Sequence, residues 1–174
     1  MTHTEDKEIE EAIKYLVFSI HQTGKNPKPV ILHSIRVGIS LYKFGYKKDI
    51  VIGGILHDLL EDTDVSFDDL KQQFGDKIAR LVYACSFDES IKDETERYKE
   101  ATERCLKEGK EALIIKAADF IDNIPYTLNR SNENDMYKFL SDKTQYFIEK
   151  ARGSIVDEVA FQELEKTFNT HSET

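Results

Sequence analysis

Residues 50–62, which read Ile-Val-Ile-Gly-Gly-Ile-Leu-His-Asp-Leu-Leu-Glu-Asp, join the longest apolar run of the chain to a cluster of polar side chains. A helix over this stretch is apolar on most of its sides, which predicts a central position in the core. Spacings of three and four residues direct four polar side chains toward one broad face of that helix: His57, Asp58, Glu61 and Asp62.

The three carboxylates of this stretch lie where a helix disfavours them. The last turn of a helix carries a negative partial charge, which costs an acidic side chain about 0.3–1 kcal/mol. Asp58, Glu61 and Asp62 also repel one another. A bound cation would offset both costs, and an imidazole next to a carboxylate matches the ligand chemistry of metal sites. A solvated helix end is the alternative, and the adjoining apolar run disfavours it.

A helical period extends along nearly the whole chain, and no stretch alternates apolar and polar residues long enough for a convincing strand. We therefore predict an all-α fold, a bundle of roughly eight to ten helices in a single domain over residues 1–174, with its core at about 5–170. Pro125 is expected to kink or shorten one helix. Besides 50–62, the predicted helices cover residues 5–21, 30–45, 66–75, 76–84, 94–107, 111–128, 134–154 and 157–168.

The composition narrows the class of protein. Lys and Arg number 24 against 33 Asp and Glu, and the resulting formal charge of −9 argues against a nucleic-acid-binding surface. The longest apolar run is far shorter than the roughly 20 residues that span a membrane. The acidic, polar start of the chain is unlike a secretory signal. These features predict a cytoplasmic protein without nucleic-acid or membrane partners, and they leave the oligomeric state open.

Two further segments place a polar side chain beside an apolar helix face. His33 lies among apolar neighbours in the helix that follows Pro29, where a lone histidine is more often a satisfied core residue than a metal ligand. Asp119 ends the mostly apolar run 112–118, and aspartate has a poor propensity for a helix interior. A buried hydrogen-bonding role is the alternative for Asp119, and a solvated acid is the simplest interpretation of Asp122.

Taken together, these residues form an H…HD…D pattern that resembles the signature of the HD phosphohydrolase superfamily. Residues 57–63, His-Asp-Leu-Leu-Glu-Asp-Thr, resemble the HD-x-x-EDT motif of RelA/SpoT hydrolase domains and of their small stand-alone relatives, the metazoan SpoT homologues. The resemblance covers residues 5–170. Three other stretches are similar to motifs of that family: Pro29 with His33, Phe74-Gly75, and residues 116–123.

The resemblance implies an HD-domain helical bundle that holds one divalent metal ion, most often Mn²⁺. It also implies removal of pyrophosphate from the 3′ position of guanosine tetra- or pentaphosphate, so the partner is a small phosphorylated nucleotide. Glu61 and Asp62 are implied as the acid pair that orients and deprotonates the attacking water. By position, the implied metal ligands are His33, His57, Asp58 and Asp119.

The nucleotide contacts implied by the resemblance are Lys25, Asn123 and Tyr146. Their structural alternatives are a solvated loop lysine, a helix-surface amide and a core aromatic. The sequence departs from the family pattern at Gly24, Phe120 and Asp122, where an arginine, a basic residue and an aromatic or histidine residue are usual. Arg97 and Lys116 are left open as phosphate contacts, since Lys116 also suits a lysine that extends from an apolar helix.

Three hypotheses for function follow. The leading one is a metal-dependent hydrolase of a small phosphorylated nucleotide, with guanosine tetraphosphate as the favoured substrate. The second is a phosphatase for another nucleotide, such as the 2′-phosphate of NADPH, which the altered Gly24 and Phe120 favour. The third is a non-catalytic helical sensor that binds nucleotide or metal, or an interaction module. The presence of both Glu61 and Asp62 favours an enzyme.

Overall fold

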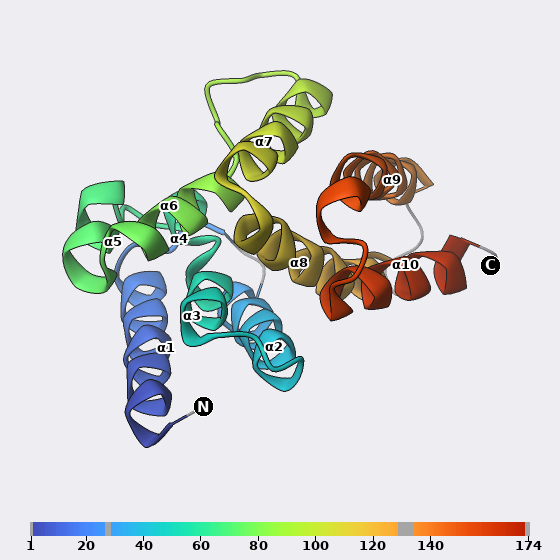
Figure 1. The fold of residues 1–174 in the computed structure, drawn as a ribbon. Helices are drawn as coiled ribbons and strands as arrows, with labels where there is room; N and C mark the ends of the chain where they lie inside the picture. The colour runs from blue at the N-terminus through green and yellow to red at the C-terminus, as the bar shows by residue number, and fades with distance from the viewer. Residues whose placement is uncertain (1, 27–28, 129–133, 173–174) are drawn as a thin grey trace.

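A computed structural model describes residues 2–26, 29–128 and 134–172 (Figure 1). Within these ranges the chain forms ten helices and no strand, which confirms the predicted all-α fold. None of these helices is both long enough and apolar enough to cross a membrane. The helices are α1 (His3–Thr23), α2 (Val30–Lys43), α3 (Lys48–Leu56), α4 (Leu59–Asp62), α5 (Phe67–Phe74), α6 (Asp76–Cys85), α7 (Glu94–Glu108), α8 (Lys110–Leu128), α9 (Asn134–Ile155) and α10 (Val159–Ser172).

Helix α3 lies at the centre of the N-terminal half, as its apolar sequence predicts. All of its residues from Ile50 to Leu56 are buried, and it packs against α1, α2, α6 and α8. Two glycines let α2 and α3 approach closely. A Cβ atom at Gly38 would lie 2.3 Å from Cγ1 of Ile55, and one at Gly54 would lie 2.4 Å from Cδ1 of Leu41.

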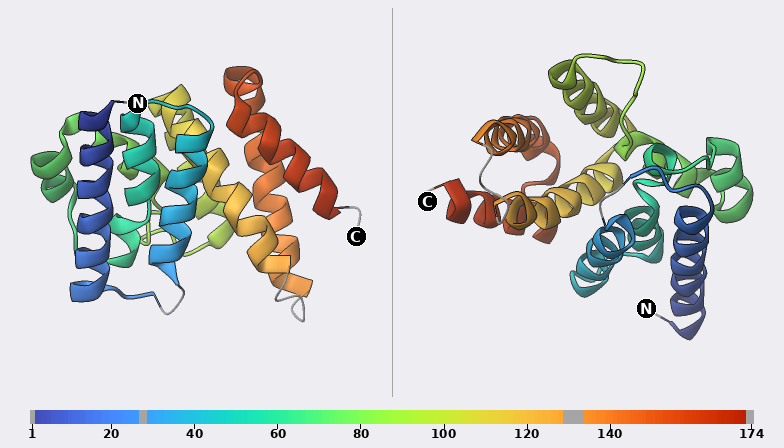
Figure 2. Two further views of the ribbon diagram at one scale, coloured as in Figure 1. Left: turned by 90° about the horizontal axis from the view of Figure 1, so that it is seen from below. Right: turned by 180° about the vertical axis from the view of Figure 1, so that it is seen from behind.

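Helix α8 joins this half to the C-terminal helices, and in Figure 2 it runs between the α1–α6 group and the pair formed by α9 and α10. Its Phe120 ring is fully buried, with its centroid 5.1 Å from that of Phe147 on α9. Pro125 does not shorten α8, which continues to Leu128. The helix accommodates Pro125 although proline removes the backbone donor that would bond the carbonyl of Ile121.

The predicted single helix over 50–62 is wrong, because the chain breaks into α3 and α4 at His57 and Asp58. Asp58 has φ −94° and ψ −4°, and the short helix α4 starts after it. The two acidic residues of α4 form contacts in different places: Glu61 with the backbone of Phe87, and Asp62 with Asn26. Because of the break, the four polar side chains do not share one continuous helix face, although His57 and Asp58 stay in contact at 3.1 Å between Nε2 and Oδ1.

Candidate metal centre

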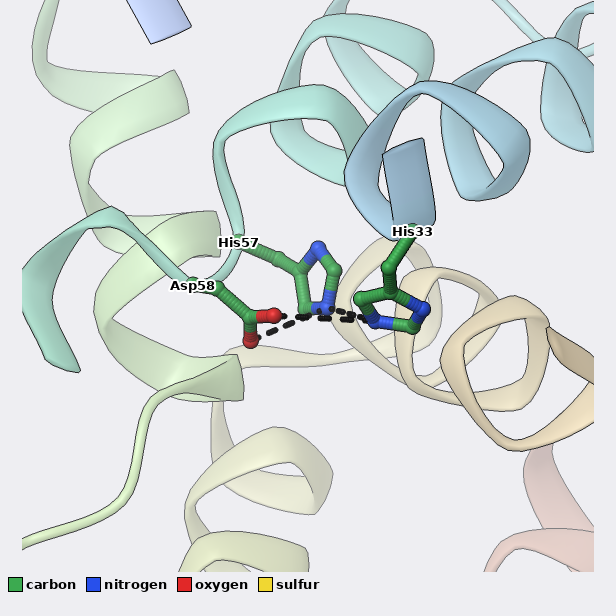
Figure 3. A group of neighbouring side chains, drawn as sticks. All are labelled: His33, His57 and Asp58. Atoms are coloured by element: carbon green, nitrogen blue, oxygen red, sulfur yellow. Dashed lines mark hydrogen bonds and ion pairs between the residues drawn. The ribbon is translucent and has the colours of Figure 1, made fainter. Parts of the chain in front are cut away.

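Two imidazoles meet where the ends of α2 and α3 converge (Figure 3). Nε2 of His33, in the first turns of α2, lies 3.3 Å from Nε2 of His57, which directly follows α3. The Asp58 carboxylate extends to the same point, with Oδ1 3.1 Å from Nε2 of His57 and Oδ2 3.6 Å from Nε2 of His33. These three groups form a compact set of potential metal ligands.

Helix α8 brings a second carboxylate to this point. Oδ1 of Asp119 lies 3.3 Å from Nε2 of His33 and 3.6 Å from Nε2 of His57. The structure thus brings together all four of the residues that the sequence pattern predicts as ligands. They come from three separate parts of the fold, so the site depends on correct packing of α2, α3 and α8.

The other nitrogen of each imidazole is held by an acceptor. Nδ1 of His57 donates to the Gly54 carbonyl at 2.8 Å, and Nδ1 of His33 donates to Oδ2 of Asp122 at 2.7 Å. Arg36 donates two hydrogen bonds to the same Asp122 carboxylate, at 2.6 and 2.8 Å. Such contacts orient imidazole ligands in metal sites and direct Nε2 toward the ion. Each ring therefore presents Nε2 to the carboxylates.

Asp122 was not predicted to have this role, and its interpretation as a solvated acid is wrong. Its carboxylate side chain is only 16% exposed and holds both His33 and Arg36. A local signal for it exists in the sequence. Arg36 lies three residues after His33, and Asp122 lies three residues after Asp119, so each helix repeats its polar residues on one face.

Asp119 has a buried cation of its own. Nζ of Lys116, one turn earlier on α8, lies 3.0 Å from Oδ2 of Asp119 and also donates to the Cys85 carbonyl at 3.0 Å. Burial opposes ionisation of Asp119, but Lys116 and the two histidines outweigh it and hold the pKa of this carboxyl well below its usual range. Lys116 is 5% exposed, so its ammonium does not extend into solvent as a surface lysine's would.

The carboxylates around His33 change the pKa of its imidazole. Burial lowers the pKa of His33, but hydrogen bonds to Asp119 and Asp122 outweigh burial and raise the pKa to about 10. The neighbouring carboxylates therefore favour a proton on the His33 ring. A metal ion displaces such a proton when it binds. Two imidazole nitrogens and two carboxylates suit a divalent metal ion, so the donor set fits one.

Glu61 lies beside this cluster and is partly buried. Its Oε1 accepts a hydrogen bond from the backbone N–H of Phe87 at 2.6 Å. Burial and the charge of Asp58 raise the pKa of Glu61 to about 7, although Lys116 opposes the shift. A carboxyl group with such a pKa can both accept and release a proton near neutral pH.

Asp62 and Lys25 meet at the segment that leads into α2. The Asp62 side chain accepts from Asn26 at 3.0 Å, and its carbonyl accepts from the N–H of Lys25 at 2.8 Å. Nζ of Lys25 pairs with Asp64 at 2.8 Å and donates to the Thr63 carbonyl at 2.9 Å. Lys25 is thus bound to the end of α4, with more than half of its side chain exposed.

The other predicted substrate contacts have different surroundings. Asn123 donates to Oδ1 of Asp119 at 2.5 Å, so it touches the ligand cluster directly. The Tyr146 hydroxyl donates to Glu103 at 3.2 Å, between α9 and α7. Phe120, where the family has a basic residue, is a core residue. Arg97 donates to the Ile91 carbonyl at 2.8 Å and thereby holds the connection before α7.

Comparisons with known proteins agree with this fold and cluster. A family model described as HD domain matches residues 12–138. The chain is 32% identical over 119 residues to guanosine-3′,5′-bis(diphosphate) 3′-pyrophosphohydrolase MESH1 of Drosophila melanogaster, covering 66% of each chain. It is 30% identical over 105 residues to the enzyme of the same activity from Aquifex aeolicus, covering 59% of this chain and 15% of that protein. The chain therefore spans less than two thirds of the length of these relatives.

Solved structures share the architecture. One, described by the words "A metazoan ortholog of SpoT hydrolyzes ppGpp and plays a role in starvation responses", aligns with a TM-score of 0.77 and 25% identity over 94% of both chains. Another, lmo0812 from Listeria monocytogenes, aligns with a TM-score of 0.69 over 85% of this chain and 98% of that one. At 23% identity, the second likeness supports the fold alone.

Proposed function

Because the chain belongs to the HD domain family, we propose that it is a metal-dependent hydrolase that removes pyrophosphate from the 3′ position of guanosine tetra- or pentaphosphate. The observation that carries this proposal is the convergence of two imidazoles and two carboxylates beside the partly buried acid Glu61. The activity of the similar MESH1 enzymes supports the choice of substrate.

His33, His57, Asp58 and Asp119 would hold one divalent ion, for which we propose Mn²⁺. Such an ion, when bound, lowers the pKa of a coordinated water and polarises a phosphoryl oxygen. The protein's own contribution is orientation. Asp122 and the Gly54 carbonyl fix the two rings, and Lys116 keeps Asp119 ionised.

Glu61 and Asp62 are the proposed acid pair. Glu61 accepts the proton of the attacking water, since its raised pKa matches transfer near neutral pH. The Phe87 N–H holds the carboxylate in place for that transfer. Asp62 is proposed as the second acid of the pair, and its backbone carbonyl also anchors the segment that carries Lys25. Lys25, Asn123 and Tyr146 are proposed to contact the nucleotide.

A panel assay tests the proposal. Purified protein would be loaded with Mn²⁺, its metal content measured, and the protein incubated with guanosine tetraphosphate, guanosine pentaphosphate, NADPH and common nucleoside triphosphates. We expect pyrophosphate release from the first two. Full metal occupancy with no phosphate or pyrophosphate released from any member would overturn the assignment to a hydrolase.

A phosphatase for the 2′-phosphate of NADPH is the second candidate, because Gly24 and Phe120 stand where the family has basic residues. The ratio of kcat/KM for guanosine tetraphosphate and NADPH decides between the two. A non-catalytic sensor would bind the nucleotide without turnover. A cytoplasmic location and the absence of a nucleic-acid partner stay predictions from the sequence.

A further inference from the structure

A second lysine lies near the centre, and no carboxylate of the described residues forms an ion pair with it. Lys143, on α9, is partly buried, and its Nζ lies 5.1 Å from the centroid of the Phe87 ring and 5.3 Å from that of Phe120. Within the described part of the chain, no carboxylate or backbone carbonyl pairs with this ammonium. Cation–π contacts with two rings are therefore the interactions that hold it.

The two rings connect Lys143 to the machinery of the site. The backbone N–H of Phe87 holds the Glu61 carboxylate, and Phe120 directly follows Asp119 on α8. The ammonium of Lys143 is thus placed between the segment that holds the proposed proton acceptor and the segment that supplies a proposed metal ligand. It is close enough to Asp119, Glu61 and Asp58 to interact with their charges.

Lys116, the neighbouring lysine, has an ion-pair partner and a hydrogen-bond acceptor. It pairs with Asp119 and donates to the Cys85 carbonyl, and its ammonium also lies 4.8 Å from the centroid of the Phe87 ring. The two ammonium groups therefore share one aromatic surface, but one of them has an internal counter-ion and the other does not. The charge of Lys143 is the one left for a ligand.

Retaining this charge is unfavourable for the fold. Burial and the positive charge of Lys116 lower the pKa of Lys143 to about 8, although Asp119, Glu61 and Asp58 oppose the shift. Because 8 lies above neutrality, the ammonium is still charged at pH 7. Buried charges without a partner are rare in proteins, because a neutral side chain of similar size would be more favourable.

We propose that Lys143 binds a phosphoryl oxygen of the substrate's polyphosphate group, beside the metal centre. This inference rests on the proposed function and adds a residue to it. A compact ammonium in an apolar slot suits a multiply charged phosphate oxygen, because charge-assisted hydrogen bonds are strongest where water is excluded. The rings of Phe87 and Phe120 limit the access of water to one side of this ammonium.

The test is the affinity of the Mn²⁺-loaded protein for inorganic pyrophosphate, measured by isothermal titration calorimetry. Lys143→Met keeps the apolar stem and removes the charge, and Lys143→Gln is a second neutral variant. Lys166→Met is the control, because it removes a charge from an exposed pair on α10. We expect pyrophosphate to bind about 10- to 100-fold more weakly to both Lys143 variants and with unchanged affinity to the control.

The unfolding temperature is a second measurement, which distinguishes a role of Lys143 in pyrophosphate binding from a role in protein stability. Removal of a partly buried charge that has no ion-pair partner among the described residues is expected to raise the unfolding temperature of Lys143→Met above that of the wild type. Metal content is expected to stay the same. Unchanged pyrophosphate affinity in both Lys143 variants would overturn the inference, and a lowered unfolding temperature with unchanged affinity would assign Lys143 a purely structural role.

Failure of the proposed function has a different signature. Pyrophosphate binding requires no turnover, so a protein that hydrolyses no nucleotide but loses pyrophosphate affinity in the Lys143 variants supports the inference and contradicts the hydrolase. A protein that hydrolyses guanosine tetraphosphate with the same KM and pyrophosphate affinity in the Lys143 variants supports the hydrolase and contradicts the inference.

Discussion

The α3 side and the α8 side of the centre each supply one carboxylate, but the fold balances the two differently. Asp119 on α8 lies 3.0 Å from the buried ammonium of Lys116. Asp58, after α3, pairs with the two histidines and, among the described residues, with no lysine or arginine. The α8 carboxylate therefore has a buried lysine as its counter-ion, whereas the α3 carboxylate has the two imidazoles. Two similar ligands can thus differ in how much their removal lowers the free energy of unfolding.

The largest expected effect separates these two carboxylates. Asp119→Ala and Asp58→Ala should both abolish metal binding and activity, because each removes a proposed ligand. In the metal-free protein, Asp119→Ala should lower the free energy of unfolding by about 3–5 kcal/mol, because it leaves Lys116 buried and unpaired. Asp58→Ala should cause no comparable loss, since it removes a charge that repels Glu61. Urea denaturation and metal analysis measure both quantities.

The double variant Asp119→Ala/Lys116→Met is the control for this comparison. It removes the whole pair and is expected to recover much of the stability lost in Asp119→Ala while still binding no metal. Equal losses of stability in the Asp58 and Asp119 single variants would contradict the difference between the two sides.

Turnover is expected to change next most strongly, at Glu61. Glu61→Gln keeps the size of the side chain and its contact with the Phe87 N–H but removes the proton acceptor. Metal content should stay at the wild-type level, while kcat falls about 10²- to 10⁴-fold. Unchanged kcat would show that proton transfer occurs elsewhere, and loss of metal would show that Glu61 belongs to the ligand set.

A smaller effect is expected at Asp122, the residue that connects α8 to α2. Asp122→Asn weakens the hold on His33 and Arg36 without touching the ligand atoms. Loss of such a contact lowers metal affinity or activity by about 10- to 100-fold. A competition titration with a metal-binding dye measures the affinity. Asp142→Asn on α9, exposed on the surface, is the matched control and should bind metal like the wild type.

The smallest effect concerns how the helices on each side are packed. Gly38→Ala places a Cβ against Ile55 across the α2–α3 contact and should destabilise the protein by about 1–3 kcal/mol. Gly153→Ala on α9 meets open space and should stabilise it by about 0.5–1 kcal/mol. Thermal denaturation of the two variants gives the comparison, and effects of the same sign would contradict it.

The helices were predictable from the sequence because burial imposes a helical period on their residues. Local signals, such as the capping box from Ser66 to Asp69, could also be predicted, because they depend on neighbouring residues alone. The break at His57 and Asp58 was not predictable, since it depends on contacts that Glu61 and Asp62 make with distant segments. The hold of Asp122 on His33 likewise joins residues 89 positions apart. Periodicity describes one helix at a time and does not specify which charges meet between helices.

The central claim is that the four-ligand centre performs a metal-dependent hydrolysis at the 3′ position of guanosine tetraphosphate. Phosphorus-31 NMR of that nucleotide, incubated with Mn²⁺-loaded wild type and with Asp58→Ala, tests this claim most directly. We predict that the wild type converts it to guanosine diphosphate and pyrophosphate and that Asp58→Ala converts none. Unchanged nucleotide with fully loaded wild type, or equal conversion by both proteins, would contradict the claim.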